Sequence, residues 1–161
     1  MKKKNIILII SLVVVLAILV FIFIYININK KETKAINISI SELEKKIEDT
    51  DEFDLDKMQN IDAETASATF LIDSSKIKDI IGKSPIVNTK AFMYVIIKAE
   101  NEDLQEIKMA LESYGTEYES IWSTYLPDQY ELVKNRKIGI KGNYVYMIIS
   151  ENPDKIVEMI K

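Results

Sequence analysis

The sequence contains neither histidine nor cysteine. Histidine and cysteine side chains bind most zinc and transition-metal ions in proteins. Cysteine also serves as a nucleophile, and histidine is the base of Ser-His triads. Their absence excludes all of these sites. It also excludes disulfides, so the folded part has to be stable through packing alone, and it leaves no cysteine that could carry a lipid anchor.

Glycine is scarce and basic charge is in deficit. Four glycines in 161 residues cannot form the clustered loops that bind dinucleotides and phosphates. The only charged residues in positions 1–29 are three lysines, which leaves 18 basic against 25 acidic side chains in the remainder. Since no basic stripe is present, we expect no nucleic-acid partner.

Ten acidic residues and three lysines lie between Glu42 and Glu64, and residues 49–56 form the densest part of this segment. Such a run invites comparison with a calcium loop, which needs a glycine at its sixth position and a glutamate at its twelfth. Counted from Asp49, these positions hold Asp54 and Asn60. We therefore interpret residues 49–56 as a solvated loop, and we expect neither a metal nor another cofactor.

A long apolar run occupies residues 6–26, interrupted only by Ser11. At ~1.5 Å per residue, a helix of this length crosses the hydrocarbon core of a bilayer, roughly 30 Å thick. The run predicts an uncleaved signal anchor over residues 1–28, with the lipid bilayer as the partner of residues 6–26. A cleavable signal peptide is the alternative, but its apolar region is usually ~7–15 residues long and ends in small residues, which do not follow here.

The charges beside the run bear on orientation. Three lysines and the amino terminus precede it, and lysines at positions 30, 31 and 34 follow it, so the positive-inside rule favours a cytoplasmic N-terminus only slightly. A short basic N-terminus before a first apolar helix is also the usual arrangement for export. We expect a single-pass plasma-membrane protein with a linker at residues 29–37 and an extracytoplasmic domain at residues 38–161.

Local sequence patterns predict the order of helices and strands in that domain. Ser39 and Glu42 form a capping box for a first helix, and a short helix, or alternatively a strand, is expected near residues 62–72. Strand patterns follow at residues 77–87 and 92–99, and a long helix comes after them. Two further strands are expected at residues 136–141 and 144–150. A last helix is expected to begin at Asn152 and Pro153. We predict a two-layer α+β domain, in which helices cover a largely antiparallel, about four-stranded sheet. The strand at residues 92–99 is expected to be central and covered on both faces.

The long helix is predicted to begin at Asn101 as its N-cap. Apolar residues then recur at alternating spacings of three and four, which places them on one face. They are Leu104, Ile107, Leu111, Tyr114, Tyr118, Ile121 and Tyr125. Packing on the sheet is favoured over a coiled-coil dimer, because Gly115 weakens an isolated helix and no regular charge pairs flank the stripe.

Two blocks carry a family resemblance: residues 122–130 (WSTYLPDQY) and residues 142–145 (GNYV). With them, the chain from about Phe53 onward resembles a domain-of-unknown-function family of small extracytoplasmic lipoproteins and membrane-anchored proteins from Gram-positive, Clostridia-like bacteria. The resemblance implies a location at the cell surface and supplies no catalytic residues. The chain departs from the family's pattern in lacking the lipidated cysteine, and in having residues 91–93 (AFM) where an acidic residue is expected.

Enzyme signals are weak. Ser75 and Lys78 match an S-x-x-K nucleophile pattern, but chance alone produces such a match and the companion motifs are missing. Paired carboxylates could serve a small cell-wall hydrolase, yet 25 acids provide candidates everywhere. We therefore expect no enzyme activity and keep that hydrolase as the alternative function.

The expected function is that of a membrane-tethered, non-catalytic binding or interaction module at the cell surface, with a protein or cell-wall partner. A subunit of a larger membrane complex is a further hypothesis. Aromatic residues with a polar group are enriched at interfaces. Tyr125, Asp128 and Gln129, at the end of a helix beside Pro127, together with Asn143 in a tight turn, are the candidate interaction surface.

Overall fold

The computed structural model describes residue 16, residues 18–21, residue 36 and residues 38–161. Contacts divide the chain into two units, Met1–Glu32 and Thr33–Lys161, and the fold below is that of the second. Most of the predicted anchor at residues 6–26 lies outside the described residues. Within the described ranges, no helix combines the length and apolar character needed to cross a bilayer.

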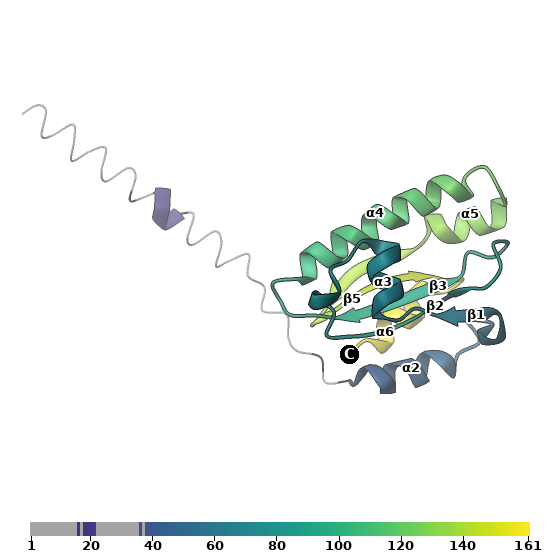
Figure 1. The fold of residues 1–161 in the computed structure, drawn as a ribbon, viewed down its shortest axis with the longest axis horizontal. Helices are drawn as coiled ribbons and strands as arrows, with labels where there is room; N and C mark the ends of the chain where they lie inside the picture. The colour runs from purple at the N-terminus through teal and green to yellow at the C-terminus, as the bar shows by residue number, and fades with distance from the viewer. Residues whose placement is uncertain (1–15, 17, 22–35, 37) are drawn as a thin grey trace, which may run out of the picture. The chain divides into compact units, whose positions relative to one another are not determined.

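A five-stranded sheet forms the centre of the domain (Figure 1). Its order is β1-β2-β3-β5-β4, and every neighbouring pair is antiparallel. The strands are β1 (Met58–Asn60), β2 (Asp79–Pro85), β3 (Met93–Lys98), β4 (Lys137–Lys141) and β5 (Tyr144–Ile149). The α+β class and the antiparallel sheet are confirmed. The sheet has one strand more than predicted, because the three residues of β1 are too few and too polar to give a strand pattern.

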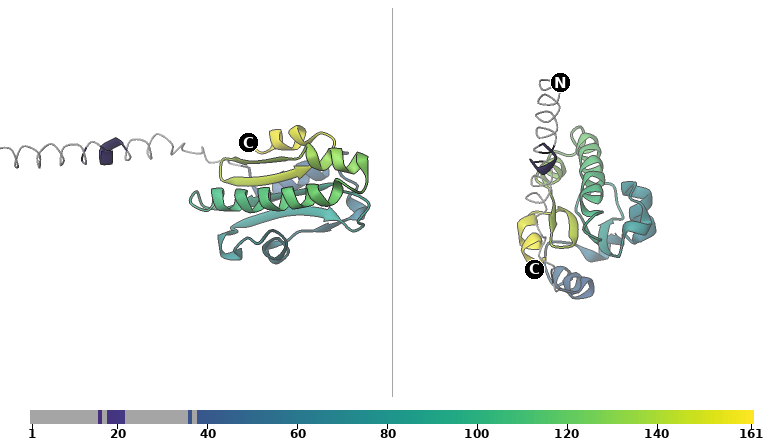
Figure 2. Two further views of the ribbon diagram at one scale, coloured as in Figure 1. Left: turned by 90° about the horizontal axis from the view of Figure 1, so that it is seen from above. Right: turned by 90° about the vertical axis from the view of Figure 1, so that its left-hand side faces the viewer.

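Helices cover both faces of the sheet, as Figures 1 and 2 show. One face packs against α3, α4 and α5, and the other against α2 and α6. These helices are α2 (Ile40–Glu48), α3 (Ala63–Phe70), α4 (Leu104–Trp122), α5 (Pro127–Lys134) and α6 (Pro153–Met159).

The prediction of two layers is therefore wrong: the domain has three. Successive side chains of a strand point to opposite faces, and β3 is apolar on both. Val95 faces the α4 side and Ile96 the α2 side, and both are fully buried. The prediction that this strand is central and covered twice is confirmed, and two covered faces require two layers of helices.

Helices α2 and α3 each begin at a polar side chain that caps them. The hydroxyl of Ser39 accepts a hydrogen bond from the Glu42 backbone N–H at the start of α2. The carboxylate of Asp62 does the same for Thr65 at the start of α3, so residues 63–70 form a helix rather than the alternative strand. Each cap satisfies an N–H group that the helix itself leaves unpaired.

The long helix α4 begins after Asp103, two residues beyond the predicted cap Asn101. It packs on the sheet as predicted, but the apolar stripe changes register along it. Ile121 is 60% exposed, whereas its neighbour Trp122 is buried. A strict seven-residue repeat drifts by about 20° per heptad around a straight helix. After two heptads the stripe has turned away from the core at Ile121, and Trp122 faces the core in its place.

Candidate functional site

Five aromatic side chains form a continuous row along α4. Phe70 contacts Tyr114 edge-on at 4.8 Å between ring centroids, and Tyr114 stacks on Tyr118 at 5.5 Å. The row continues through Trp122 at 5.9 Å to Tyr125 at 5.6 Å. Spacings of four residues on α4 align Tyr114, Tyr118 and Trp122, while α3 contributes Phe70 and the segment after α4 contributes Tyr125.

The aromatic row lines a surface hollow of about 490 Å³, which we call the aromatic groove. Its lining residues come from α3, the C-terminal half of α4, the sheet and the loop between β2 and β3. The described lining residues are Gln59, Ile61, Thr65, Thr69, Phe70, Ser84, Pro85, Ile86, Val87, Asn88, Lys90, Met93, Tyr114, Tyr118, Ile121, Trp122 and Tyr125. Lys90 is the only charged residue among them.

Large apolar side chains stand exposed on the rim of the groove. Ile86 is 61% exposed, Val87 44%, Ile121 60% and Tyr125 55%. Single exposed apolar residues are ordinary, whereas grouped ones are typical of interaction surfaces. Ile86 and Val87 come from the β2–β3 loop, Ile121 comes from the end of α4, and Tyr125 follows that helix.

The phenols inside the groove are neutral at physiological pH. Burial raises the pKa of Tyr114 and that of Tyr118 above the usual tyrosine value, because desolvation disfavours the phenolate. Both groups therefore remain uncharged hydroxyls that can form hydrogen bonds.

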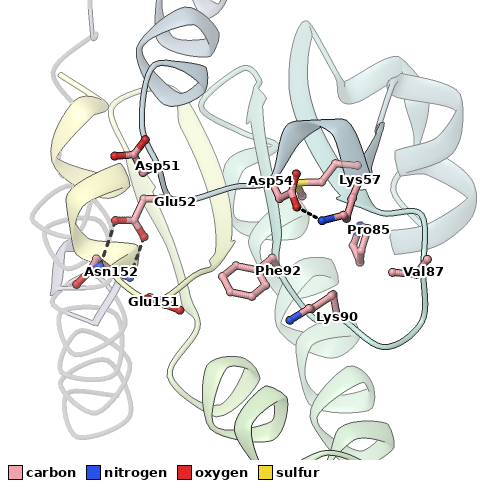
Figure 3. A pocket seen from close by; sticks show the side chains of 11 residues that line it. Asp51, Glu52, Asp54, Lys57, Pro85, Val87, Lys90, Phe92, Glu151 and Asn152 are labelled. Atoms are coloured by element: carbon pink, nitrogen blue, oxygen red, sulfur yellow. Dashed lines mark hydrogen bonds and ion pairs between the residues drawn. The ribbon is translucent and has the colours of Figure 1, made fainter.

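A second hollow of about 510 Å³ lies on the other side of the β2–β3 loop, and we call it the acidic hollow (Figure 3). It shares Pro85, Val87 and Lys90 with the aromatic groove. Its described lining residues are Asp51, Glu52, Asp54, Lys57, Met58, Pro85, Val87, Lys90, Phe92, Glu151 and Asn152. Four carboxylates thus face two lysines around an apolar wall.

Two of the four carboxylates have partners within the domain. Glu52 accepts hydrogen bonds from the backbone N–H and the side-chain amide of Asn152, both at 3.1 Å. Asp54 accepts one from Lys57 at 2.5 Å. Within residues 38–161, no hydrogen bond or ion pair engages the side chains of Asp51 and Glu151, and both residues are exposed.

This arrangement does not resemble a hydrolytic carboxylate pair. A glycosidase acid is usually a carboxyl group in an apolar pocket, whereas Asp51, Asp54 and Glu151 are solvent-exposed and Glu52 is held by α6. No cluster of three metal-binding side chains occurs in the described part of the chain.

The two S-x-x-K residues are engaged with neighbouring side chains and not with each other. The hydroxyl of Ser75 donates to the carboxylate of Asp73 at 2.8 Å, and Lys78 pairs with Glu100 at 3.1 Å. Each polar group of the predicted dyad is thus engaged elsewhere.

The predicted interaction residues do not come together. Tyr125 and Asp128 are exposed, as expected, but only Tyr125 is among the described residues that line the groove. Gln129 is buried, contrary to expectation, because its carbonyl oxygen accepts the Ala91 backbone N–H at 2.9 Å and so joins α5 to the start of β3.

Asn143 lies at the opposite end of the sheet from Tyr125. Its carbonyl accepts the N–H of Ala99, a few residues before α4 begins, whereas Tyr125 follows the end of that 19-residue helix. The sequence also gave no reason to select Ile86, Val87 and Ile121. The one pattern that could have indicated Ile86 and Val87 was their position as an apolar pair directly after Pro85, which ends the strand.

A three-layered α+β domain with a neutral surface groove is the class that this fold and site define. The family model for the domain of unknown function DUF4358 matches residues 51–150, and the chain belongs to this family. Neither the curated proteins nor the solved structures compared with it gave a match. The matched stretch contains every residue that lines the aromatic groove.

Proposed function

We propose that the protein is a membrane-tethered, non-catalytic module that binds another protein through the aromatic groove. The observation that carries the proposal is the charge depletion of this groove. Charged residues are 29% of the chain, yet Lys90 is the only one among the described lining residues. Binding surfaces in proteins are depleted of charge at their centre and enriched in tyrosine and tryptophan.

A protein partner fits this surface better than a sugar polymer does. The rim presents aliphatic Ile86, Val87 and Ile121, which gain free energy when another apolar surface removes them from water. Trp122 is almost fully buried, so it offers no flat platform on which a sugar ring could stack.

The tether and the location belong to the same proposal. The apolar run at residues 6–26 supports insertion into the plasma membrane, and the basic N-terminus supports export of the domain. The resemblance to cell-surface lipoproteins and membrane-anchored proteins of Gram-positive, Clostridia-like bacteria supports the same location. In this arrangement the groove faces the cell wall or external space.

Site-directed photocrosslinking in intact cells tests the groove. A benzophenone amino acid at Ile121 should form a defined adduct with a partner protein, and Val87→Ser should abolish it. The same probe at Lys45, an exposed residue of α2 on the other side of the sheet, is the control and should give no such adduct. Adducts of equal yield at both positions, or adducts insensitive to Val87→Ser, would exclude the groove as the binding site.

Fractionation of the full-length chain tests the tether. We expect the protein in the membrane fraction, resistant to high salt and released by detergent, and we expect protease added to whole cells without a wall to digest the domain. A full-length chain with an intact N-terminus that stays in the supernatant without detergent contradicts the proposal.

A further inference from the structure

The acidic segment between Glu42 and Glu64 borders the aromatic groove. It runs through α2, the following loop, β1 and the start of α3, and it carries ten acidic residues against three lysines. It supplies Asp51, Glu52 and Asp54 to the acidic hollow, and Gln59 and Ile61 to the groove itself. A neutral groove therefore lies beside a strongly negative surface.

Part of this negative charge is not neutralised within the domain. Lys57 is paired with Asp54, and Glu52 is bonded to Asn152 and to Lys155, at 3.4 Å from the latter's ammonium. Asp51 and Glu151 have no such partner among the described residues, and Lys90 is the only unengaged cation of the hollow. In Figure 3, Asp51 and Glu151 lie on one side of Phe92, and Pro85 and Val87 lie on the other.

The two hollows form one continuous recognition surface. Pro85, Val87 and Lys90 line both, so a chain segment that lies over Val87 contacts the aromatic groove on one side and the acidic hollow on the other. Complementary charges at an interface steer association and select the partner more than they add affinity.

Resting on the proposed function, we infer that the groove's partner is a polypeptide segment with apolar side chains next to a lysine or arginine. The apolar side chains enter the aromatic groove, and the basic side chain crosses Val87 to reach Asp51 and Glu151. An acidic segment, an anionic lipid surface or a nucleic-acid backbone meets repulsion at the same place.

Lys90 makes it possible to test whether the partner segment is basic or acidic. Lys90 lines both the groove and the acidic hollow, so its positive charge weakens the attraction for a basic partner. Removing its charge should therefore strengthen the binding of a basic segment and weaken that of an acidic one.

A random dodecapeptide library displayed on phage is the probe. It is selected on the full-length protein in nanodiscs of neutral lipid and counter-selected on the Val87→Ser/Ile121→Ser variant. We expect the recovered groove-dependent peptides to be enriched in lysine and arginine adjacent to leucine, isoleucine or aromatic residues.

Affinities of the best synthetic peptide then isolate the charge contribution. Asp51→Asn/Glu151→Gln should weaken binding by roughly 5- to 20-fold at low salt, and the difference should shrink as salt rises. Lys90→Gln should strengthen binding by roughly 2- to 5-fold. The control Glu102→Gln/Glu158→Gln removes the same charge from two exposed residues outside both hollows, and it should leave affinity within about 2-fold.

The outcomes separate the two proposals. Groove-dependent peptides without basic enrichment, or ones whose affinity ignores Asp51→Asn/Glu151→Gln, overturn the inference and leave the proposed function standing. Peptides that bind the Val87→Ser/Ile121→Ser variant equally well, or a failure to recover any groove-dependent peptide, count against the groove itself. Equal unfolding midpoints of the variants establish that the losses come from binding.

Discussion

Glu52 caps the last helix of the domain at Asn152, a hundred residues further along the chain. Its carboxylate accepts both the backbone N–H and the side-chain amide of Asn152, and its side chain is only 6% exposed. The amide of Asn152 makes no capping bond of its own within α6. The loop after α2 thus supplies the N-terminal cap of α6 and joins the two helices on one face of the sheet.

Replacing this cap should lower stability. Glu52→Ala removes the acceptor and the negative charge at the positive end of α6, and we expect the free energy of unfolding to fall by about 1–2 kcal/mol. Urea unfolding measures it. Glu151→Ala, an exposed neighbour in the acidic hollow, is the control and should change stability by no more than about 0.5 kcal/mol. Equal effects of the two substitutions would show that Glu52 does not act as a cap.

Gly115 permits the close approach of Arg136 to α4. A Cβ at this position would lie 2.6 Å from Nε of Arg136, whose Nη1 donates to Glu119 at 2.6 Å and to the Val133 carbonyl at 2.9 Å. Gly→Ala in a helix ordinarily stabilises by about 1 kcal/mol. Here we expect Gly115→Ala to destabilise by about 1 kcal/mol, because the guanidinium has to leave its partners.

The Arg136→Ala background supplies the control for that prediction. Without the arginine side chain, Gly115→Ala should regain its ordinary sign and stabilise by roughly 0.5–1 kcal/mol. A thermal or urea double-mutant cycle measures both values. Stabilisation by Gly115→Ala in both backgrounds would contradict the packing role assigned to this glycine.

Leu71 ends α3 in a left-handed conformation, with φ of 56°, and its side chain is 87% exposed. This conformation brings the Cβ of an L-residue close to the backbone, a strain that glycine does not have. We expect Leu71→Gly to stabilise the domain by about 0.5–1 kcal/mol. Met109→Gly, at an exposed position inside α4, should destabilise by about 1 kcal/mol. Loss of stability in both variants would refute the strain at Leu71.

Alkaline pH should destabilise the domain through the phenols of the groove. Burial raises the pKa of Tyr114, so the folded state holds its proton more tightly than the unfolded chain, where tyrosine titrates near 10. The resulting stability is fully present below pH ~10 and is lost as pH rises further through the folded-state pKa. Tyr114→Phe should make the free energy of unfolding less dependent on pH above ~10, as measured by urea unfolding together with absorbance near 295 nm. The same pH dependence in the variant and the wild type would contradict this assignment.

Local chemistry made many elements predictable from sequence. The Ser39 capping box, the apolar strand at residues 92–99 and the turn at Gly142, with its φ of 60°, all follow from residues close in the chain. The candidate site was much less predictable. Gln129 looked like a surface residue because its acceptor role depends on Ala91, 38 positions away, and Ile121 looked buried because heptad counting ignores helical drift.

The sequence by itself determined most of the helices and strands, and it excluded the chemistry that needs histidine or cysteine. Cap residues, alternating strands and a helical stripe each act over a few residues, so their effect is present before any long-range contact forms. Only the tertiary structure decided that helices cover both faces of the sheet, that Glu52 caps α6 and that five aromatic rings line a neutral groove beside an acidic hollow. These features depend on which distant surfaces pack together, and packing depends on the shapes of whole elements rather than on any local pattern.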